Sequence, residues 1–274
     1  MNTAHHQRYK LLASDLDGTL MGDDFVLSPR VKNAVSRAIE RGVHVTLATG
    51  RGYAATLRYA RELGITTPLI CYQGGQIRDA SSGEVIHNVT MSRALAEQAI
   101  NLAQERDWHL CLYVGDRVFL NDFLRPPEFY EQLVSTDVHR VPDLTAALDG
   151  HEPTKFIIIA DEPQADRIEE QLRARMDGCL RVVRSHRLFV EGNPLQATKG
   201  RALARLAGLL GVDRGEVMAI GDQGNDDDMV SWAGLGVALG NAVTQVKAVA
   251  DYIAPSVDED GAAVAIERFL LDGG

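Results

Sequence analysis

Asp15-Leu16-Asp17-Gly18-Thr19 is the stretch that decides the fold of this 274-residue chain. The apolar run Leu11–Ala13 before it predicts a short buried strand, so two carboxylates emerge where a strand ends and a glycine lets the chain turn. In open α/β sheets, ligands bind at the carboxyl ends of the strands. Two like charges this close repel each other, and a bound divalent cation would relieve the repulsion. The pair suits phosphoryl transfer, and an Asp-Gly turn with two solvated acids is the alternative.

Strands and helices alternate through the first quarter of the chain. Ser28-Pro29 predicts a helix start, with serine as the cap, and Gly42 predicts its end. Further apolar strands are expected at Val43–Ala48 and Pro68–Cys71, separated by a helix that ends at Leu63. This order predicts a parallel, doubly wound, Rossmann-like sheet of the α/β class.

The alternation stops after the third strand and resumes at Lys199. Hairpin patterns and two long helices lie between, which predicts a separate α+β unit with an antiparallel sheet and helices on one face. The predicted division is therefore a core domain at 1–89 and 191–274 with an inserted α/β cap domain at 90–190. A small hairpin is also expected over Leu20–Leu27, around a turn at Gly22-Asp23-Asp24.

Polar residues follow four of the predicted strands. They are Asp15 and Asp17, Thr49 with Gly50, Gly74 with Gly75, and Asp222 with Asn225 and Asp226. Because the carboxyl ends of parallel strands meet at one edge of a sheet, we expect these residues to gather there. Lys199 opens a helix, where the helix dipole disfavours a cation, and this favours a functional lysine over a solvated one. The set contains the nucleophile, acid/base, hydroxyl, cation and metal-binding carboxylates that phosphoryl transfer needs.

These motifs, in this order, resemble the four motifs of the haloacid dehalogenase superfamily, and the resemblance covers essentially the whole chain. They are Asp15-Leu16-Asp17-Gly18-Thr19, Thr49-Gly50-Arg51, Lys199-Gly200 and Gly221-Asp222-Gln223-Gly224-Asn225-Asp226. The insert after the third core strand is similar to the large α/β cap of the Cof-like phosphatases. One departure is Gln73-Gly74, where many relatives carry Asn-Gly.

The resemblance implies catalytic roles for Asp15, Asp17, Thr49 and Lys199. Asp15 corresponds to the nucleophile that forms an aspartyl-phosphate, and Asp17 to the acid that protonates the leaving oxygen and then activates water. The implied substrate-binding residues are Thr49, Gly50, Arg51 and Lys199. Lys199 also keeps Asp15 ionised in this interpretation.

The resemblance also implies a Mg²⁺ site formed by Asp15, Asp222 and the backbone carbonyl of Asp17. Asn225 and Asp226 correspond to an outer shell that steadies the metal or Lys199. A set of oxygen ligands that leaves room for water suits Mg²⁺ rather than zinc.

Composition excludes several other classes. The chain has 28 basic and 38 acidic residues and a net charge of −10, which argues against a nucleic-acid-binding footprint. Three widely spaced cysteines give neither a disulfide framework nor a zinc motif. No apolar run is long enough to span a membrane, and Met1–Lys10 lacks the apolar core of a signal peptide. We expect a cytoplasmic monomer or homodimer without membrane or nucleic-acid partners.

The favoured function is a Mg²⁺-dependent phosphatase that acts on a small phosphorylated metabolite, either a sugar phosphate or a phosphorylated cofactor. A phosphomutase on the same scaffold is the alternative within enzymes. Outside enzymes, the alternatives are a receiver in which Asp15 only stores a phosphoryl group and a metabolite-binding protein with vestigial chemistry. Asp17 argues against the receiver, because a second carboxylate would speed loss of the phosphoryl group.

Overall fold

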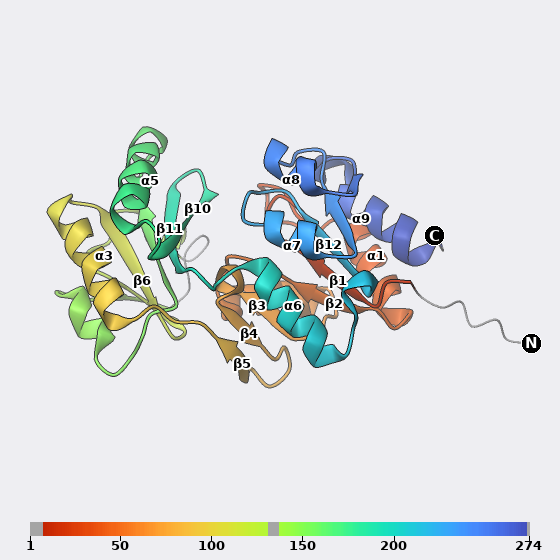
Figure 1. Ribbon diagram of the computed structural model, residues 1–274, viewed down its shortest axis with the longest axis horizontal. Helices are drawn as coiled ribbons and strands as arrows, with labels where there is room; N and C mark the ends of the chain where they lie inside the picture. The colour runs from red at the N-terminus through yellow and green to blue at the C-terminus, as the bar shows by residue number, and fades with distance from the viewer. Residues whose placement is uncertain (1–7, 131–136, 273–274) are drawn as a thin grey trace, which may run out of the picture.

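The computed structural model describes residues 8–130 and 137–272, which fold into two layered parts side by side (Figure 1). The larger part contains both the beginning and the end of the described chain, and the smaller part contains its middle. Most of Met1–Lys10 and the second half of the polar stretch up to Thr136, whose structure the sequence left open, lie outside the described residues.

A parallel sheet with the strand order β14-β13-β12-β1-β2 forms the centre of the larger part. Its strands are β1 Leu11–Ser14, β2 His44–Leu47, β12 Val217–Gly221, β13 Leu235–Ala238 and β14 Tyr252–Ile253. The first strand, β1, lies between β2 and β12, with Ser14 paired to Leu47 on one side and to Ile220 on the other. The residue after β1 is therefore at the middle of the sheet edge.

Helices cover both faces of this sheet, as the doubly wound pattern predicts. The helices are α1 Pro29–Glu40, α2 Tyr53–Glu62, α6 Lys199–Leu210, α7 Asp227–Trp232, α8 Thr244–Val249 and α9 Gly261–Ile266. Alternate residues of β1 enter different apolar clusters: Leu12 packs with α1, α2 and α9, whereas Leu11 and Ala13 pack with α6, α7 and α8. The helix start at Ser28 is confirmed, since its side chain accepts a hydrogen bond from the Val31 amide.

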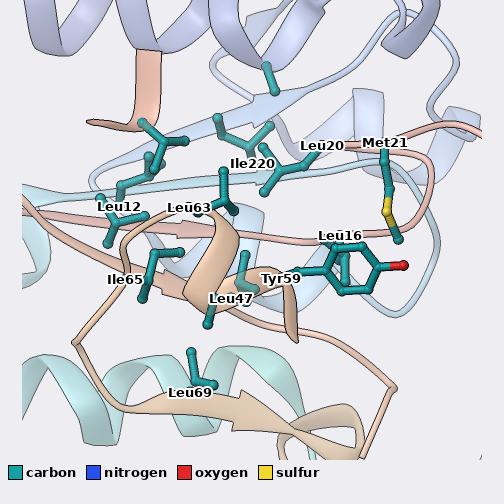
Figure 2. Packing of buried hydrophobic residues seen from close by; sticks show 14 of the residues in the cluster. Leu12, Leu16, Leu20, Met21, Leu47, Tyr59, Leu63, Ile65, Leu69 and Ile220 are labelled. Carbon is teal, nitrogen blue, oxygen red and sulfur yellow. The ribbon is translucent and has the colours of Figure 1, made fainter. Parts of the chain in front are cut away.

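The first of these clusters forms a continuous apolar layer beneath the sheet edge (Figure 2). Leu12, Leu16 and Leu47 are fully buried in it, together with Ile220 from β12. Each such side chain contributes about 1.5–3 kcal/mol when buried. The packing of Leu16 between the two acids of the Asp15-Leu16-Asp17 stretch fixes that turn to the core while both carboxyl groups remain free for polar contacts.

The third predicted strand, β3 Leu69–Cys71, departs from the simple parallel picture. It pairs antiparallel with β4 Gln76–Arg78, which pairs with β5 Val85–Asn88, and it touches the main sheet through one bridge between Ala48 and Ile70. The tight 3₁₀ turn Tyr72–Gly74 returns the chain directly into β4 and so favours this antiparallel pairing. The hairpin expected over Leu20–Leu27 is likewise reduced to a bridge between Met21 and Leu27.

The smaller part is built on a second sheet with the order β10-β11-β9-β6-β7-β8. Its strands are β6 His109–Val114, β7 Arg117–Leu120, β8 Val138–Arg140, β9 Lys155–Ile159, β10 Leu180–His186 and β11 Phe189–Pro194. Neighbouring strands run antiparallel except for β7 and β8, which are parallel. Strand β11 crosses residue 190, where the sequence placed the end of the insert, and continues to Pro194.

Two long helices, α3 Arg93–Glu105 and α5 Glu162–Met176, lie on the outer side of this sheet, away from the larger part (Figure 1). Their apolar sides pack with Leu112, Phe156 and Ile158. The alternate residues Tyr113 and Ile157 point the other way and join the apolar cluster of the larger part. The short α4 Pro127–Phe129 lies between β7 and β8 in the chain.

Within the described ranges, none of the helices has the length and apolar character needed to cross a membrane.

Candidate active site

The predicted gathering of strand ends is observed. Asp15 follows β1, and its amide donates to the Ile220 carbonyl at 3.0 Å, which places it beside Asp222 at the end of β12. Thr49 follows β2, and its amide donates to the Ile70 carbonyl at 2.9 Å. Asp15, Thr49 and Asn225 line one cavity at this edge of the sheet.

Lys199 lies at the centre of the site as a fully buried cation. Its Nζ donates to Asp15 Oδ1 at 2.7 Å and to Asp226 Oδ1 at 2.6 Å, and the exposed fractions of the three side chains are 0%, 7% and 0%. Helix α6 begins at Lys199 because Thr198 caps it by accepting a hydrogen bond from the Arg201 amide. Burial alone would lower the pKa of Lys199, but Asp15 and Asp226 raise it above its ordinary value, so the ammonium stays charged.

Asp226 steadies Lys199 rather than acting as a free carboxylate. Its Oδ2 accepts hydrogen bonds from the backbone amides of Asp222 and Gln223, both at 3.0 Å. Gly221 permits this approach, because a Cβ at that position would lie 2.5 Å from the Asp226 Cβ. Asp226 therefore fixes the loop after β12 and one side of the ammonium.

Three buried carboxylates, those of Asp15, Asp222 and Asp226, have oxygens within 4.8 Å of one another. Burial raises the pKa of Asp15 well above its usual range, and Asp226 raises it further, whereas Lys199 lowers it. Burial, followed by Asp226, also raises the pKa of Asp222 to about 6. Because one ammonium faces three carboxylates, this cluster favours a further cation.

The donor set fits a hard divalent cation. Asp226 is already occupied by Lys199 and two amides, which leaves one oxygen of Asp15 and the carboxylate of Asp222. Asp222 is oriented by Thr19 Oγ1, which donates to Oδ1 at 2.8 Å, and by Gln223 Nε2, which donates to Oδ2 at 2.9 Å. Oxygen ligands of this kind suit Mg²⁺.

Asp17 lies outside the cluster of three carboxylates, and the chain turns directly after it at Gly18, which adopts φ +80°. Its carboxylate is held bidentately by Arg51, with Nε donating to Oδ2 at 2.7 Å and Nη2 to Oδ1 at 2.6 Å. The guanidinium also lies 5.3 Å from the Phe25 ring centre and 5.4 Å from that of Tyr59. In this structure Arg51 thus binds the candidate acid/base.

Thr49 and Gly50 form the loop beside the nucleophile. The Thr49 side chain is buried, and its Oγ1 accepts a hydrogen bond from the Arg51 amide at 3.2 Å. Asn225 does not contact Lys199 by a hydrogen bond: its Nδ2 donates to Gln73 Oε1 at 2.8 Å. The resemblance implied an outer-shell role for Asn225 and no contact for Gln73, so this pairing is a finding of the structure.

The second sheet supplies the opposite wall of the cavity, whose volume is about 130 Å³. This wall consists of Tyr113, Lys155, Ile157, Ser185, Phe189 and Glu191. A wider adjoining hollow is bordered by Arg184 and Arg187 from the β10–β11 hairpin and shares Asp17, Phe25 and Gln223 with the cavity. The second sheet therefore roofs the strand ends of the first.

Lys155 and Glu191, from the second sheet, connect that sheet to the loop that contains Thr49 and Gly50. Neither residue was identified as functional from the sequence. Lys155 Nζ donates to Glu191 Oε2 at 2.8 Å and to the Gly50 carbonyl at 2.9 Å. Their side chains are only 2% and 3% exposed. Glu191 also accepts a hydrogen bond from the Ser185 hydroxyl. Charged residues at the ends of apolar strands were the signal that could have identified them.

The fold and the site define an α/β protein with an acidic, lysine-containing centre at the carboxyl edge of a parallel sheet. A model of a family described as haloacid dehalogenase-like hydrolase matches residues 12–266, so the chain belongs to this family. The resemblance to the haloacid dehalogenase superfamily stated from the motifs is thereby confirmed.

Relatives along the whole chain are phosphatases by name. A putative phosphatase, YxeH of Bacillus subtilis (strain 168), is 31% identical over 273 residues and covers 96% of this chain and 99% of its own. The 5-amino-6-(5-phospho-D-ribitylamino)uracil phosphatase YcsE of the same organism is 31% identical over 263 residues, covering 96% of each. A solved haloacid dehalogenase-like hydrolase from Bacteroides thetaiotaomicron is 32% identical, covers 95% of this chain and 99% of its own, and superposes with a TM-score of 0.83. The prediction of an enzyme, a phosphatase of the haloacid dehalogenase type, is confirmed.

Proposed function

We propose that this chain is a Mg²⁺-dependent phosphatase that hydrolyses a small phosphorylated metabolite, a sugar phosphate or a phosphorylated cofactor, through an aspartyl-phosphate on Asp15. The observation that carries the proposal is the position of Lys199, whose Nζ donates hydrogen bonds to Asp15 at 2.7 Å and to Asp226 at 2.6 Å. Asp15 and Thr49 line the same cavity. A relative from Serratia proteamaculans (strain 568), 28% identical over 245 residues, is named HMP-PP phosphatase, which supports a small phosphorylated substrate.

In the first step, a carboxylate oxygen of Asp15 attacks phosphorus, and the bond from phosphorus to the ester oxygen breaks. Asp17 donates a proton to that departing oxygen. In the second step, Asp17 takes a proton from water, the water oxygen attacks phosphorus, and the bond to Asp15 breaks to release phosphate and restore the carboxylate. Together the two steps return Asp15 and Asp17 to their starting states.

The phosphoryl oxygens are held by Lys199, the Thr49 hydroxyl and the Gly50 amide, and these donors neutralise charge that develops during transfer. Arg51 orients Asp17 and contributes positive charge to the same cavity. Asp15, Asp222 and the backbone carbonyl of Asp17 would hold Mg²⁺, with Asn225 and Asp226 outside them. The cation, when bound, would neutralise negative charge on the phosphoryl oxygens.

The inserted segment acts in this proposal as a cap domain, 90–190, over a core domain of 1–89 and 191–274. Its sheet closes the cavity opposite Asp15, so water is excluded during attack and the cap must open for release. A cavity of about 130 Å³ accepts a small ester, whereas a folded phosphoprotein would be excluded. The enzyme acts as a monomer or a homodimer.

A screen of phosphorylated metabolites with Mg²⁺ present tests the proposal. We expect hydrolysis of at least one small ester, and Asp15→Asn should abolish it without unfolding the chain, because the amide cannot attack phosphorus. Transfer of the phosphoryl group to a second substrate molecule would identify a phosphomutase. One stoichiometric phosphorylation without turnover would identify a receiver, and binding without phosphorylation would identify a metabolite-binding protein.

A further inference from the structure

Gln73 carries a buried amide that is only half satisfied. It follows β3 at the carboxyl edge of the core, and its side chain is 0% exposed. Its Oε1 accepts from Asn225 Nδ2 at 2.8 Å, whereas its Nε2 has no hydrogen-bond partner among the described residues. Buried polar groups are nearly always hydrogen-bonded, so an unpaired buried N–H group calls for an acceptor.

The backbone at Gln73 is held in an unusual conformation. Tyr72, Gln73 and Gly74 have φ angles of 53°, 58° and 88°, all in the left-handed region that residues with a Cβ rarely adopt. The Tyr72 and Gln73 amides donate to the carbonyls of Arg51 and Thr49, both at 3.0 Å. The surrounding loop thus enforces this conformation, and such enforced strain is concentrated at functional sites.

The free end of the amide lies beside the candidate phosphate loop. A Cβ built on Gly50 would be 2.4 Å from Gln73 Nε2, so the glycine is required for the amide to reach this position. Gln73 lines the same cavity as Asp15, Thr49 and Gly50. Since Asn225 occupies the oxygen of the amide, the donor rather than the acceptor is directed toward the loop.

We propose that Gln73 Nε2 donates a hydrogen bond to a non-bridging oxygen of the phosphoryl group as it is transferred to and from Asp15. This inference deepens the proposed function and rests on it. The contact makes Gln73 a catalytic residue, a neutral donor that complements Lys199 without adding charge to the acidic cluster. A donor that is fixed before the reaction strengthens its hydrogen bond as charge builds up on the phosphoryl oxygens.

Two substitutions separate this role from a merely structural one. Gln73→Glu keeps the shape and an oxygen that accepts from Asn225, but replaces the donor with a negative charge. Gln73→Leu removes the donor and the acceptor without adding charge. A structural role, in which Gln73 only holds Asn225, predicts that Gln73→Glu is the more active variant; the donor role predicts that Gln73→Leu is the more active one.

The measurement is kcat and KM for the best ester, with the inhibition constant of orthovanadate, for the wild type and both variants. We expect kcat of Gln73→Leu to fall by about 10²-fold, the effect typical of one lost donor, and kcat/KM to fall at least as far because bound phosphate also loses the contact. Gln73→Glu should fall further, and vanadate inhibition should weaken in parallel. Full activity in Gln73→Leu, or an active Gln73→Glu beside an inactive Gln73→Leu, would overturn the proposal.

Gln73→Asn gives an independent readout. Asparagine adopts left-handed backbone more readily than glutamine, so this variant should unfold at an equal or higher temperature. Its amide is one methylene shorter and should lose reach, so kcat should nevertheless fall by about tenfold, a smaller loss than removal of the donor causes. The matched control is Gln76→Leu, because Gln76 is also buried and partly unpaired but does not line the cavity.

Binding of inorganic phosphate tests the contact without turnover. In the wild type, phosphate with Mg²⁺ should raise the unfolding temperature, and Gln73→Leu should lose most of that increase while Gln76→Leu keeps it. Equal increases in the wild type and Gln73→Leu would overturn the inference about Gln73. A wild type that binds phosphate through Gln73 but hydrolyses no ester would instead overturn the proposed function.

Discussion

Lys199 and Asp226 form an ion pair from which solvent is completely excluded: both side chains are 0% exposed, and Nζ lies 2.6 Å from Oδ1. The same ammonium holds Asp15 at 2.7 Å. Since the desolvation of two carboxylates and an ammonium is costly, loss of the ammonium would leave two buried carboxylates without a compensating charge. The geometry therefore couples the stability of the core to the ionisation of the candidate nucleophile.

Replacing Lys199 with methionine should destabilise the chain by about 3–5 kcal/mol, because two buried carboxylates lose their cation. Denaturant unfolding of metal-free protein measures this change. Adding Asp226→Asn should recover part of the loss, since only one uncompensated carboxylate then remains. Lys32→Met is the matched control, because Lys32 pairs with Glu62 at the surface and should change stability by less than about 1 kcal/mol. Equal effects of Lys199→Met and Lys32→Met would contradict the prediction.

Mg²⁺ should stabilise the wild type by about 2.7 kcal/mol at 100 times its dissociation constant, measured by thermal unfolding. Chelator should abolish activity and Mg²⁺ should restore it, whereas Ca²⁺ should restore it poorly because it takes more ligands at longer distances. Full activity in excess chelator would contradict the metal site.

Asp222→Asn should separate metal binding from folding. Burial and Asp226 raise the pKa of Asp222 from 3.8 to about 6, so in the metal-free protein its ionisation lowers stability as pH rises between these two values, and the loss is complete above the higher one. At pH 7.5 the variant should therefore unfold at a higher temperature than the wild type without metal, yet gain little from Mg²⁺. The half-buried neighbour Asp227 provides the control, since Asp227→Asn should keep the Mg²⁺ response.

Arg51→Met should affect poor leaving groups more than good ones. Arg51 holds both oxygens of Asp17, which we propose as the proton donor, and only a poor leaving group needs that proton. We expect kcat/KM for an alkyl phosphate to fall at least tenfold more than for 4-nitrophenyl phosphate. The control is Arg58→Met, because Arg58 lies on helix α2, which follows Arg51 in the chain, and is exposed. Equal losses of kcat/KM on both esters would contradict the claim that Arg51 acts by holding Asp17.

Phe189→Ala should alter the choice of substrate. Phe189 belongs to the roof of the cavity and is 5% exposed. We therefore expect it to contact the part of the substrate that leaves rather than the phosphoryl group. We expect kcat/KM for the best metabolite to fall by about 10–200-fold, as for other lost apolar pocket contacts, with a smaller change for 4-nitrophenyl phosphate. Phe119→Ala, from the same sheet but outside the cavity, is the control. An equal loss of kcat/KM for both substrates would contradict the claim that Phe189 helps to select the substrate.

Local sequence patterns predicted the features that depend on neighbouring residues. Apolar runs followed by Asp15, Thr49 and Asp222 indicated strands whose ends meet, and the structure brings these ends together. Lys199 stood out because a lysine is unfavourable at a helix start, and its burial between Asp15 and Asp226 explains the exception.

Contacts between distant segments could not be predicted in the same way. Periodicity identified β3 as a strand but not its antiparallel pairing with β4. The Arg51–Asp17 pair depends on the turn at Gly18, and the position of Gln73 depends on three consecutive left-handed residues. Lys155 on β9 and Glu191 on β11 are 36 residues apart, so their pairing follows from sheet register rather than from local sequence.

The central claim, that Asp15 becomes phosphorylated, is tested most directly by a burst experiment with Asp17→Asn. 4-Nitrophenolate leaves without a proton, so the first step should survive, whereas the second step lacks its base. We predict a burst close to one nitrophenolate per chain and a phosphoryl group on the tryptic peptide 11–30, both absent when Asp15→Asn is added. No burst from a variant that still binds Mg²⁺, or a phosphoryl group on another peptide, would contradict the claim.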